Sequence, residues 1–138
     1  MQQMRESRKV LLLGSDNPRM ARLSEILSRH AKVARAEDIP EGLGLLARGA
    51  YEAVFCDGRF HCGTWQEALE TIQALYPELP IVIVSQTNGT DEGIREWTEV
   101  LYAGAFDLLL APSNEYSVVT VMEHALASGE ARALRAAG

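Results

Sequence analysis

Short apolar runs alternate with longer segments of helical periodicity along the chain. The apolar runs cover 9–14, 31–36, 51–57, 79–85 and 105–112, and continuous runs of this length are typical of strands buried on both faces. The second run, "AKVARA", is more polar, so we expect it at an edge of the sheet. The fourth run, "LPIVIVS", is rich in β-branched residues, which favour strands.

The segments between these runs carry apolar residues at helical spacing. Asn17, Asp38 and Thr64 are candidate N-caps, because their side-chain oxygens can accept hydrogen bonds from the first helical N–H groups. Gly129 is expected to interrupt the last helix. The predicted helical segments lie within 15–30, 37–50, 64–78, 94–104 and 113–138.

Five strands alternating with five helices predict an α/β fold. The expected architecture is a flavodoxin-like, doubly wound, five-stranded parallel sheet in the order 2-1-3-4-5, or (βα)5. We expect this domain to cover residues 1–129. Residues 130–138, which are charged and rich in Ala, are expected to form a helical tail or linker running towards a further domain.

Composition narrows the class of protein. The chain has 138 residues, which suits one domain. The formal net charge of −6 argues against direct nucleic-acid binding, which normally requires a basic patch. No apolar run is long enough for a membrane span or a signal peptide. Cys56 and Cys62 are expected to be free thiols in a reducing cytoplasm.

Polar residues follow four of the five apolar runs, in "GSDN", "CDG", "SQT" and "APS". Because the carboxyl ends of parallel strands share one edge of a sheet, we expect these residues to gather there. Asp57 closes the third run, Ser85 closes the fourth 28 residues later (85 − 57 = 28), and Pro112 ends the fifth. An aspartate at such a position is either a turn residue beside Gly58 or a working group.

With these residues in these places, the chain resembles the receiver domain of two-component response regulators from Lys9 to about Ala127. The stretch "AGAFDLLLAPS" is similar to the family's Gly-Ala-aromatic-Asp ending before a Lys-Pro pair. The resemblance implies that Asp57 is the position phosphorylated by a histidine kinase and that Ser85 is the position that contacts the phosphoryl group. It also implies a cytoplasmic, non-enzymatic signalling module, with an output domain such as a transcription regulator beyond the C-terminus.

The chain departs from the family pattern at positions that carry charged side chains in the family. The acidic pair that holds Mg²⁺ in the family falls at Gly14 and Ser15, neither of which has a carboxylate. The family's lysine before the proline is replaced by Ala111, and its switch aromatic by Leu108. Asp16 follows the vacated pair and is the candidate substitute ligand.

Phosphoryl transfer depends on positioning and on neutralising charge, and Mg²⁺ needs carboxylate ligands. We therefore expect a receiver-type module that signals through protein–protein interaction, with weak or no phosphorylation and no required cofactor. The alternative is a working phosphoacceptor in which Asp16 and Asp57 hold Mg²⁺. A further alternative is a small-ligand binder that uses the vacated acidic pocket.

The expected partners are a histidine kinase or another signalling protein, and a second copy of the chain. In receivers, the face formed by the fourth helix, fifth strand and fifth helix usually docks partners, and Trp97, Tyr102 and Tyr116 fall there. The alternative is that Trp97 belongs to the core. An exposed aromatic on this face would favour docking, because aromatic residues are enriched in interface cores.

Simpler structural roles remain open for the polar residues. Asp16 and Asn17 can cap the first helix, and Ser85 can satisfy backbone groups at a strand end.

A metal site formed by Cys56, His61, Cys62 and Asp57 lacks the usual C-x₂₋₄-C spacing of zinc sites. Side chains also alternate along a strand, so Cys56 is expected to point away from Asp57.

Overall fold

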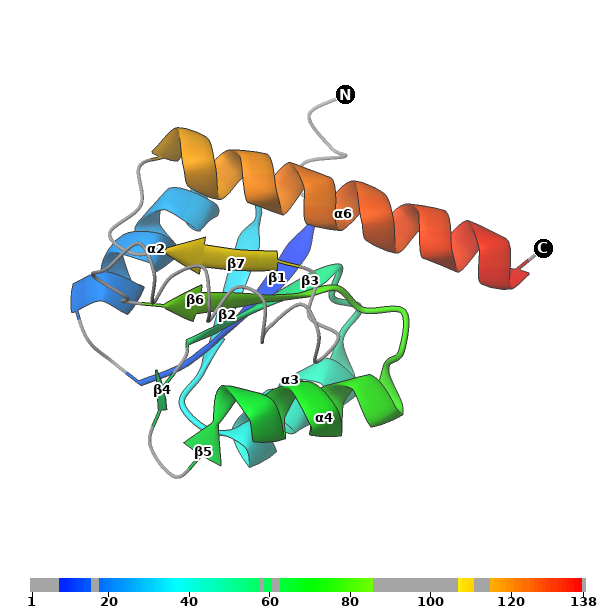
Figure 1. Ribbon diagram of the computed structural model, residues 1–138, viewed down its shortest axis with the longest axis horizontal. Coiled ribbons are helices and arrows are strands. Elements are labelled where there is room, and N and C mark those ends of the chain that lie inside the picture. The colour runs from blue at the N-terminus through cyan, green and yellow to red at the C-terminus, as the bar shows by residue number, and fades with distance from the viewer. Residues whose placement is uncertain are drawn as a thin grey trace, which may run out of the picture.

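The computed structural model describes residues 8–15, 18–57, 59–60, 63–85, 107–110 and 115–137, with the backbone alone for 19, 59–60, 63, 85, 107–110 and 129–137. In chain order the elements are β1 (Lys9–Leu13), α2 (Pro18–Ser28), β2 (Lys32–Ala36), α3 (Ile39–Arg48), β3 (Ala53–Asp57), β4 (Arg59–Phe60), β5 (Gly63–Thr64), α4 (Trp65–Leu75), β6 (Ile81–Ser85), β7 (Asp107–Leu110) and α6 (Glu115–Ala137). Figure 1 shows this arrangement.

The main sheet has the strand order β2-β1-β3-β6-β7, and each neighbouring pair is parallel. This confirms the predicted order and the predicted parallel sheet. The polar strand β2 lies at an edge, as its composition indicated. The predicted helix over 94–104 lies outside the described residues, so the complete (βα)5 arrangement remains a prediction.

Helices cover both faces of the sheet, and the alternation of side chains along each strand supplies one core to each face. In Figure 1, α2 and α6 lie on one side of the sheet, and α3 and α4 lie on the other. Phe55 packs in the core beneath α2 and α6, whereas Val54 and Cys56 pack in the core beneath α3 and α4. Strands buried on both faces explain why their sequences are continuous apolar runs.

Two of the predicted helix caps are confirmed by hydrogen bonds. The Glu41 N–H donates to Asp38 Oδ1 at 2.9 Å, and the Glu67 N–H donates to Thr64 Oγ1 at 3.3 Å. Each bond satisfies an N–H group that has no partner within its own helix. The third candidate cap, Asn17, lies outside the described residues.

The structure differs from the sequence prediction at two places. Helix α6 is continuous through Gly129, so the predicted interruption is wrong. A single glycine costs a helix only about 1 kcal/mol, and helix-forming residues surround this one. A small antiparallel hairpin, β4 with β5, was not predicted, because strands of two residues carry no detectable periodicity.

The C-terminal end of α6 projects beyond the sheet in Figure 1. Among the helices that the structure describes, none has the length and hydropathy needed to cross a bilayer.

Candidate functional site

Asp57 is the last residue of β3, at the edge where the strands present their carboxyl ends. It pairs in register with Val84 of β6, and Ser85 follows as the last residue of that strand. The topology therefore brings the ends of β3 and β6 together, as predicted for the phosphoacceptor and phosphoryl-contact positions. Asp57 is 1% exposed, and among the described residues it is the buried one with a carboxyl side chain.

Gly14 follows the last residue of β1 and lies against Asp57. Its N–H donates to the Ala36 carbonyl at 2.9 Å, which fixes its backbone to the end of β2. A Cβ atom placed on Gly14 would lie 2.7 Å from the Asp57 Cβ and 2.9 Å from the Met20 Cε. Real Cβ atoms do not approach other atoms this closely. The absence of a side chain at position 14 therefore allows the ends of β1 and β3 to meet.

The residues placed at the vacated acidic pair thus have different surroundings. Gly14 is buried against Asp57, whereas Ser15 is half-buried and already carries a Cβ and a hydroxyl. Met20, the third residue of α2, is fully buried, and its methyl group lies where a side chain at position 14 would be. The helical periodicity of the sequence did not indicate that Met20 contacts the candidate site.

The other predicted site positions are only partly described. Leu108 pairs with Ile83, and Leu110, the last residue of β7, pairs with Ser85. The end of β7 therefore reaches the same edge as Asp57, in agreement with the predicted position of the fifth strand. Asp16 and Ala111 lie outside the described residues, so their predicted roles stay predictions.

The described residues do not fit a magnesium site of the receiver type. Mg²⁺ prefers octahedral oxygen ligands and is held by one or two carboxylates. At the described positions of this edge the carboxylate is that of Asp57 alone, and the space beside Gly14 is filled by the Asp57 Cβ and the Met20 methyl. Within the part of the chain that the structure describes, no group of three or more His, Cys, Asp or Glu side chains is placed to hold a metal.

Cys56 precedes Asp57 and belongs to the core beneath α3 and α4. Its thiol donates to the Asp57 carbonyl oxygen at 3.4 Å. Burial raises the pKa of this thiol well above its usual value, and the nearby charge of Asp57 raises it further. A thiol that stays protonated is a poor nucleophile and a poor metal ligand. His61 and Cys62, the other two residues of the metal site that the sequence argued against, lie outside the described residues.

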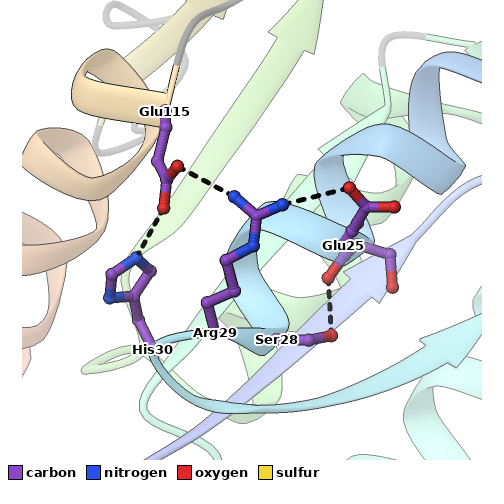
Figure 2. Close-up of polar contacts among 6 residues, drawn as sticks. Glu25, Ser28, Arg29, His30 and Glu115 are labelled. Carbon is purple, nitrogen blue, oxygen red and sulfur yellow. Dashed lines mark hydrogen bonds and ion pairs between the residues drawn. The ribbon is translucent and has the colours of Figure 1, made fainter.

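A second polar cluster joins the end of α2 to the first turn of α6, and Figure 2 shows it. The Glu115 carboxylate accepts from Arg29 Nη1 at 2.8 Å and lies 3.2 Å from His30 Nε2. Arg29 also donates to Glu25 Oε1 at 3.1 Å. The pKa of Glu115 is held below its usual value, first by the His30 hydrogen bond and then by the charges of Arg29 and His30.

Sequence patterns do not indicate this junction, because its partners are 85 and 86 positions apart. His30 lies beyond the end of α2 and faces the Glu115 carboxylate. A second ion pair, between Arg8 and Glu123 at 3.0 Å, attaches α6 to the start of β1. Together the two ion pairs tie α6 to the first half of the chain.

A cavity of about 580 Å³ lies at the opposite edge of the sheet, away from Asp57. It is lined by the segments that precede β3 and β6 and by the end of α4, including Tyr51, Tyr76 and Leu79. The predicted small-ligand site was the vacated acidic pocket at the other edge, and it stays a prediction, because Asp16 lies outside the described residues.

Tyr116, on the first turn of α6, is 80% exposed. An exposed aromatic at this position is the feature expected of a docking surface. Trp97 and Tyr102 lie outside the described residues, so the choice between core and surface for Trp97 stays open.

Comparison with known proteins gives a sequence relative but no family model, since none matches the chain. Over 108 residues the chain is 30% identical to the response regulator protein PilR of Pseudomonas aeruginosa. The matched segment covers 77% of this chain and 23% of PilR. The chain therefore spans about a quarter of the length of this curated relative.

Solved structures share the fold. NtrX from Brucella abortus superposes with a TM-score of 0.82 and 21% identity, covering 94% of this chain and 29% of NtrX. A response regulator receiver domain protein from Clostridium thermocellum superposes with a TM-score of 0.77 and 16% identity, covering 89% of this chain and 97% of that protein. The chain thus shares the fold of response regulator receiver domains, and over 108 residues it is similar in sequence to a response regulator protein.

Proposed function

We propose that this chain is a receiver-type module of a two-component or phosphorelay system that signals mainly by binding partner proteins. Phosphorylation of Asp57 is weak or absent in this proposal, and no cofactor is required. The module is not an enzyme, and its compartment is the cytoplasm. The expected partners are a histidine kinase or another signalling protein, an output domain beyond the C-terminus, and a second copy of the chain.

The observation that carries this proposal is the closure of the site around Asp57. A phosphoacceptor carboxylate must meet a phosphodonor in line, with its oxygens accessible and its charge balanced by cations. Asp57 is 1% exposed, and it packs against Gly14, where an added Cβ would lie 2.7 Å from the Asp57 Cβ. A phosphodonor can therefore reach the Asp57 carboxylate only after the surroundings of Asp57 open.

The residues at the family's charge-supplying positions point the same way. Gly14, Ser15 and Ala111 replace two acids and a lysine, so the chain has neither the carboxylates nor the cation at those positions. Removing preorganised charge from a transfer site lowers its rate by orders of magnitude, because catalysis there is largely electrostatic.

The surface of α6 supports partner binding as the remaining activity. Tyr116 is exposed at the start of α6, next to the Glu115 junction. Aromatic side chains of this kind often anchor interfaces, because they bury a large area with little loss of conformational freedom. The alternative is a working phosphoacceptor with Mg²⁺ held by Asp16 and Asp57. In that case a phosphodonor would phosphorylate the chain.

The test is incubation of the purified chain with Mg²⁺ and acetyl phosphate, followed by intact-mass spectrometry over time. We expect no stoichiometric gain of a phosphoryl group. The Asp57→Asn variant, which keeps the size of the side chain and removes the acceptor oxygen, is the matched control for adventitious labelling. Rapid, complete phosphorylation that Asp57→Asn abolishes would overturn the proposal, and its loss in Asp16→Asn would establish the alternative.

A further inference from the structure

The cavity at the amino edge of the sheet lies between the segments that lead into two central strands. Tyr51 and Glu52 precede β3, and Leu79 and Pro80 precede β6. The ends of α3 and α4 complete the walls, together with Leu126 of α6. The volume of the cavity is about 580 Å³. Sites for small molecules commonly have volumes of about 300–1,000 Å³, so the cavity has the size of a ligand site.

Backbone hydrogen bonds hold the walls of this cavity in place. The Leu79 N–H donates to the Tyr76 carbonyl at 3.1 Å and closes the turn that follows α4. The Val54 N–H donates to the Pro80 carbonyl at 3.0 Å and ties the end of this turn to β3. A ligand that enters between fixed walls loses less binding free energy to the ordering of the protein.

Most of the lining is apolar or aromatic. Tyr51, Tyr76 and Leu79 are partly buried and pack against the core beneath α3 and α4. Leu75, the last residue of α4, also lines the cavity and is 60% exposed. A ligand with an apolar or aromatic body would remove part of these surfaces from water, and this burial favours binding.

The charges around the cavity favour one class of apolar ligand. Among the described residues that line it, Glu52 and Glu78 carry carboxylates and none carries a cationic side chain. The nearby Lys9 ammonium lies 5.3 Å from the centre of the Tyr51 ring, as cations do at the electron-rich faces of aromatic rings. The two carboxylates outnumber this ammonium, and the chain as a whole has a formal net charge of −6. A positively charged ligand is therefore favoured over a neutral or an anionic one.

We propose that this cavity binds a small organic cation, an amine or amidine with an aromatic or aliphatic body. The body lies against Tyr51, Tyr76 and Leu79, and the positive group lies towards Glu78, which is exposed. The site goes beyond the proposed function, because it lies at the opposite edge of the sheet from Asp57. The two proposals therefore stand or fall separately.

The test is a titration of the ¹⁵N-labelled full chain with benzamidine, monitored by the chemical shifts of the backbone amides. Benzamide, which is neutral, and benzoate, which is anionic, have nearly the same shape and are the matched ligands. We expect saturable shifts centred on residues 49–52 and 75–79. The Kd for benzamidine should be at least about threefold lower than that for benzamide, because a cation gains from carboxylates and aromatic faces. Benzoate is expected to bind more weakly than benzamide.

Substitutions of exposed residues separate the charge from the apolar contact. Glu78→Gln is expected to weaken benzamidine binding about twofold or more and to leave benzamide binding unchanged. Glu70→Gln removes the same charge from an exposed position of α4 outside the lining, and it is expected to leave both affinities unchanged. Leu75→Ala is expected to weaken both ligands by a similar factor, because it removes apolar contact area.

Three results of the titrations would overturn the inference. These are an absence of shifts at the lining residues, equal affinities for benzamidine and benzoate, and equal effects of Glu78→Gln and Glu70→Gln. Sedimentation velocity at the same concentrations tests a different occupant, a second copy of the chain. A dimer whose formation shifts the amides of the lining, and which persists in saturating benzamidine, would also overturn the inference.

Discussion

Two carboxylates lie at two junctions of opposite character. Asp57 is 1% exposed at the end of a central strand. It packs against Gly14, where an added Cβ would meet the Asp57 Cβ. The Glu115 side chain is 46% exposed at the start of α6, and its partners are the flexible ends of Arg29 and His30. A side chain added at Gly14 would have to displace β1 or β3, whereas loss of the Glu115 carboxylate leaves a site that water can fill. Packing therefore constrains the first junction, and electrostatics stabilises the second.

The largest effect is expected from Gly14→Ala. The added Cβ would lie 2.7 Å from the Asp57 Cβ, so β1 and β3 must separate locally. Overpacking of this kind typically lowers the free energy of unfolding by about 1–3 kcal/mol, which urea denaturation measures.

Gly44→Ala is the matched control for that substitution, because a Cβ at Gly44 in α3 meets nothing within 4 Å. It is expected to raise the free energy of unfolding by about 0.5–1 kcal/mol, since alanine favours helices over glycine. The packing account of Gly14 would be wrong if both substitutions changed the free energy of unfolding by the same amount in the same direction.

The next effect concerns Cys56, which shares the buried end of β3. Cys56 is buried in the folded chain, so reagents do not reach its thiol. Burial also raises the pKa of this thiol, so it stays protonated. We expect its alkylation to be at least about 100-fold slower in the native state than in urea, because core segments open rarely. Tryptic cleavage after Arg59 places Cys56 and Cys62 in different peptides, so mass spectrometry reports on each separately. Equal labelling of Cys56 in both states would contradict its burial.

The smallest effect is expected at the exposed junction, from Glu115→Gln. The pKa of Glu115 is lowered in the folded state, so the stability it contributes is present above its ordinary pKa of 4.5. That contribution is lost as the pH falls through the folded-state pKa. The difference in melting temperature between the unsubstituted chain and Glu115→Gln should therefore be small at neutral pH, shrink with salt, and vanish in acid.

Glu70→Gln, on the exposed surface of α4, is the control for the general effect of removing a negative charge. A difference for Glu115→Gln that grows as the pH falls below 4.5, or one that Glu70→Gln reproduces, would contradict the assigned role of the junction.

The sequence predicted the parts of the fold that depend on local pattern. Continuous apolar runs located the strands, and Asp38 and Thr64 marked two helix starts with the hydrogen bonds that the structure shows. The predicted strand order was the flavodoxin-like one, chosen for five alternating units in a chain of this size, and it placed Asp57 beside the end of β6.

The features that the sequence did not predict depend on contacts between distant segments. The closure at Gly14 depends on how closely two strands approach and on where the Met20 methyl rests. The Arg29–Glu115 pair depends on the way α2 and α6 pack on the same face of the sheet. Hydrophobic periodicity and residue spacing do not show how close β1 comes to β3 or how close Arg29 comes to Glu115. From the sequence alone, Gly14 indicated only that one carboxylate of the family's acidic pair is missing.

The most direct test of the closed site is a crystal structure of the chain grown with Mg²⁺ and beryllofluoride, which mimics a phosphoryl group on an aspartate. The account predicts that Asp57 stays buried against Gly14, with neither the metal nor the fluoride complex bound to it. Beryllofluoride on the Asp57 carboxylate, with Mg²⁺ coordinated beside it and the ends of β1 and β3 moved apart, would contradict the account.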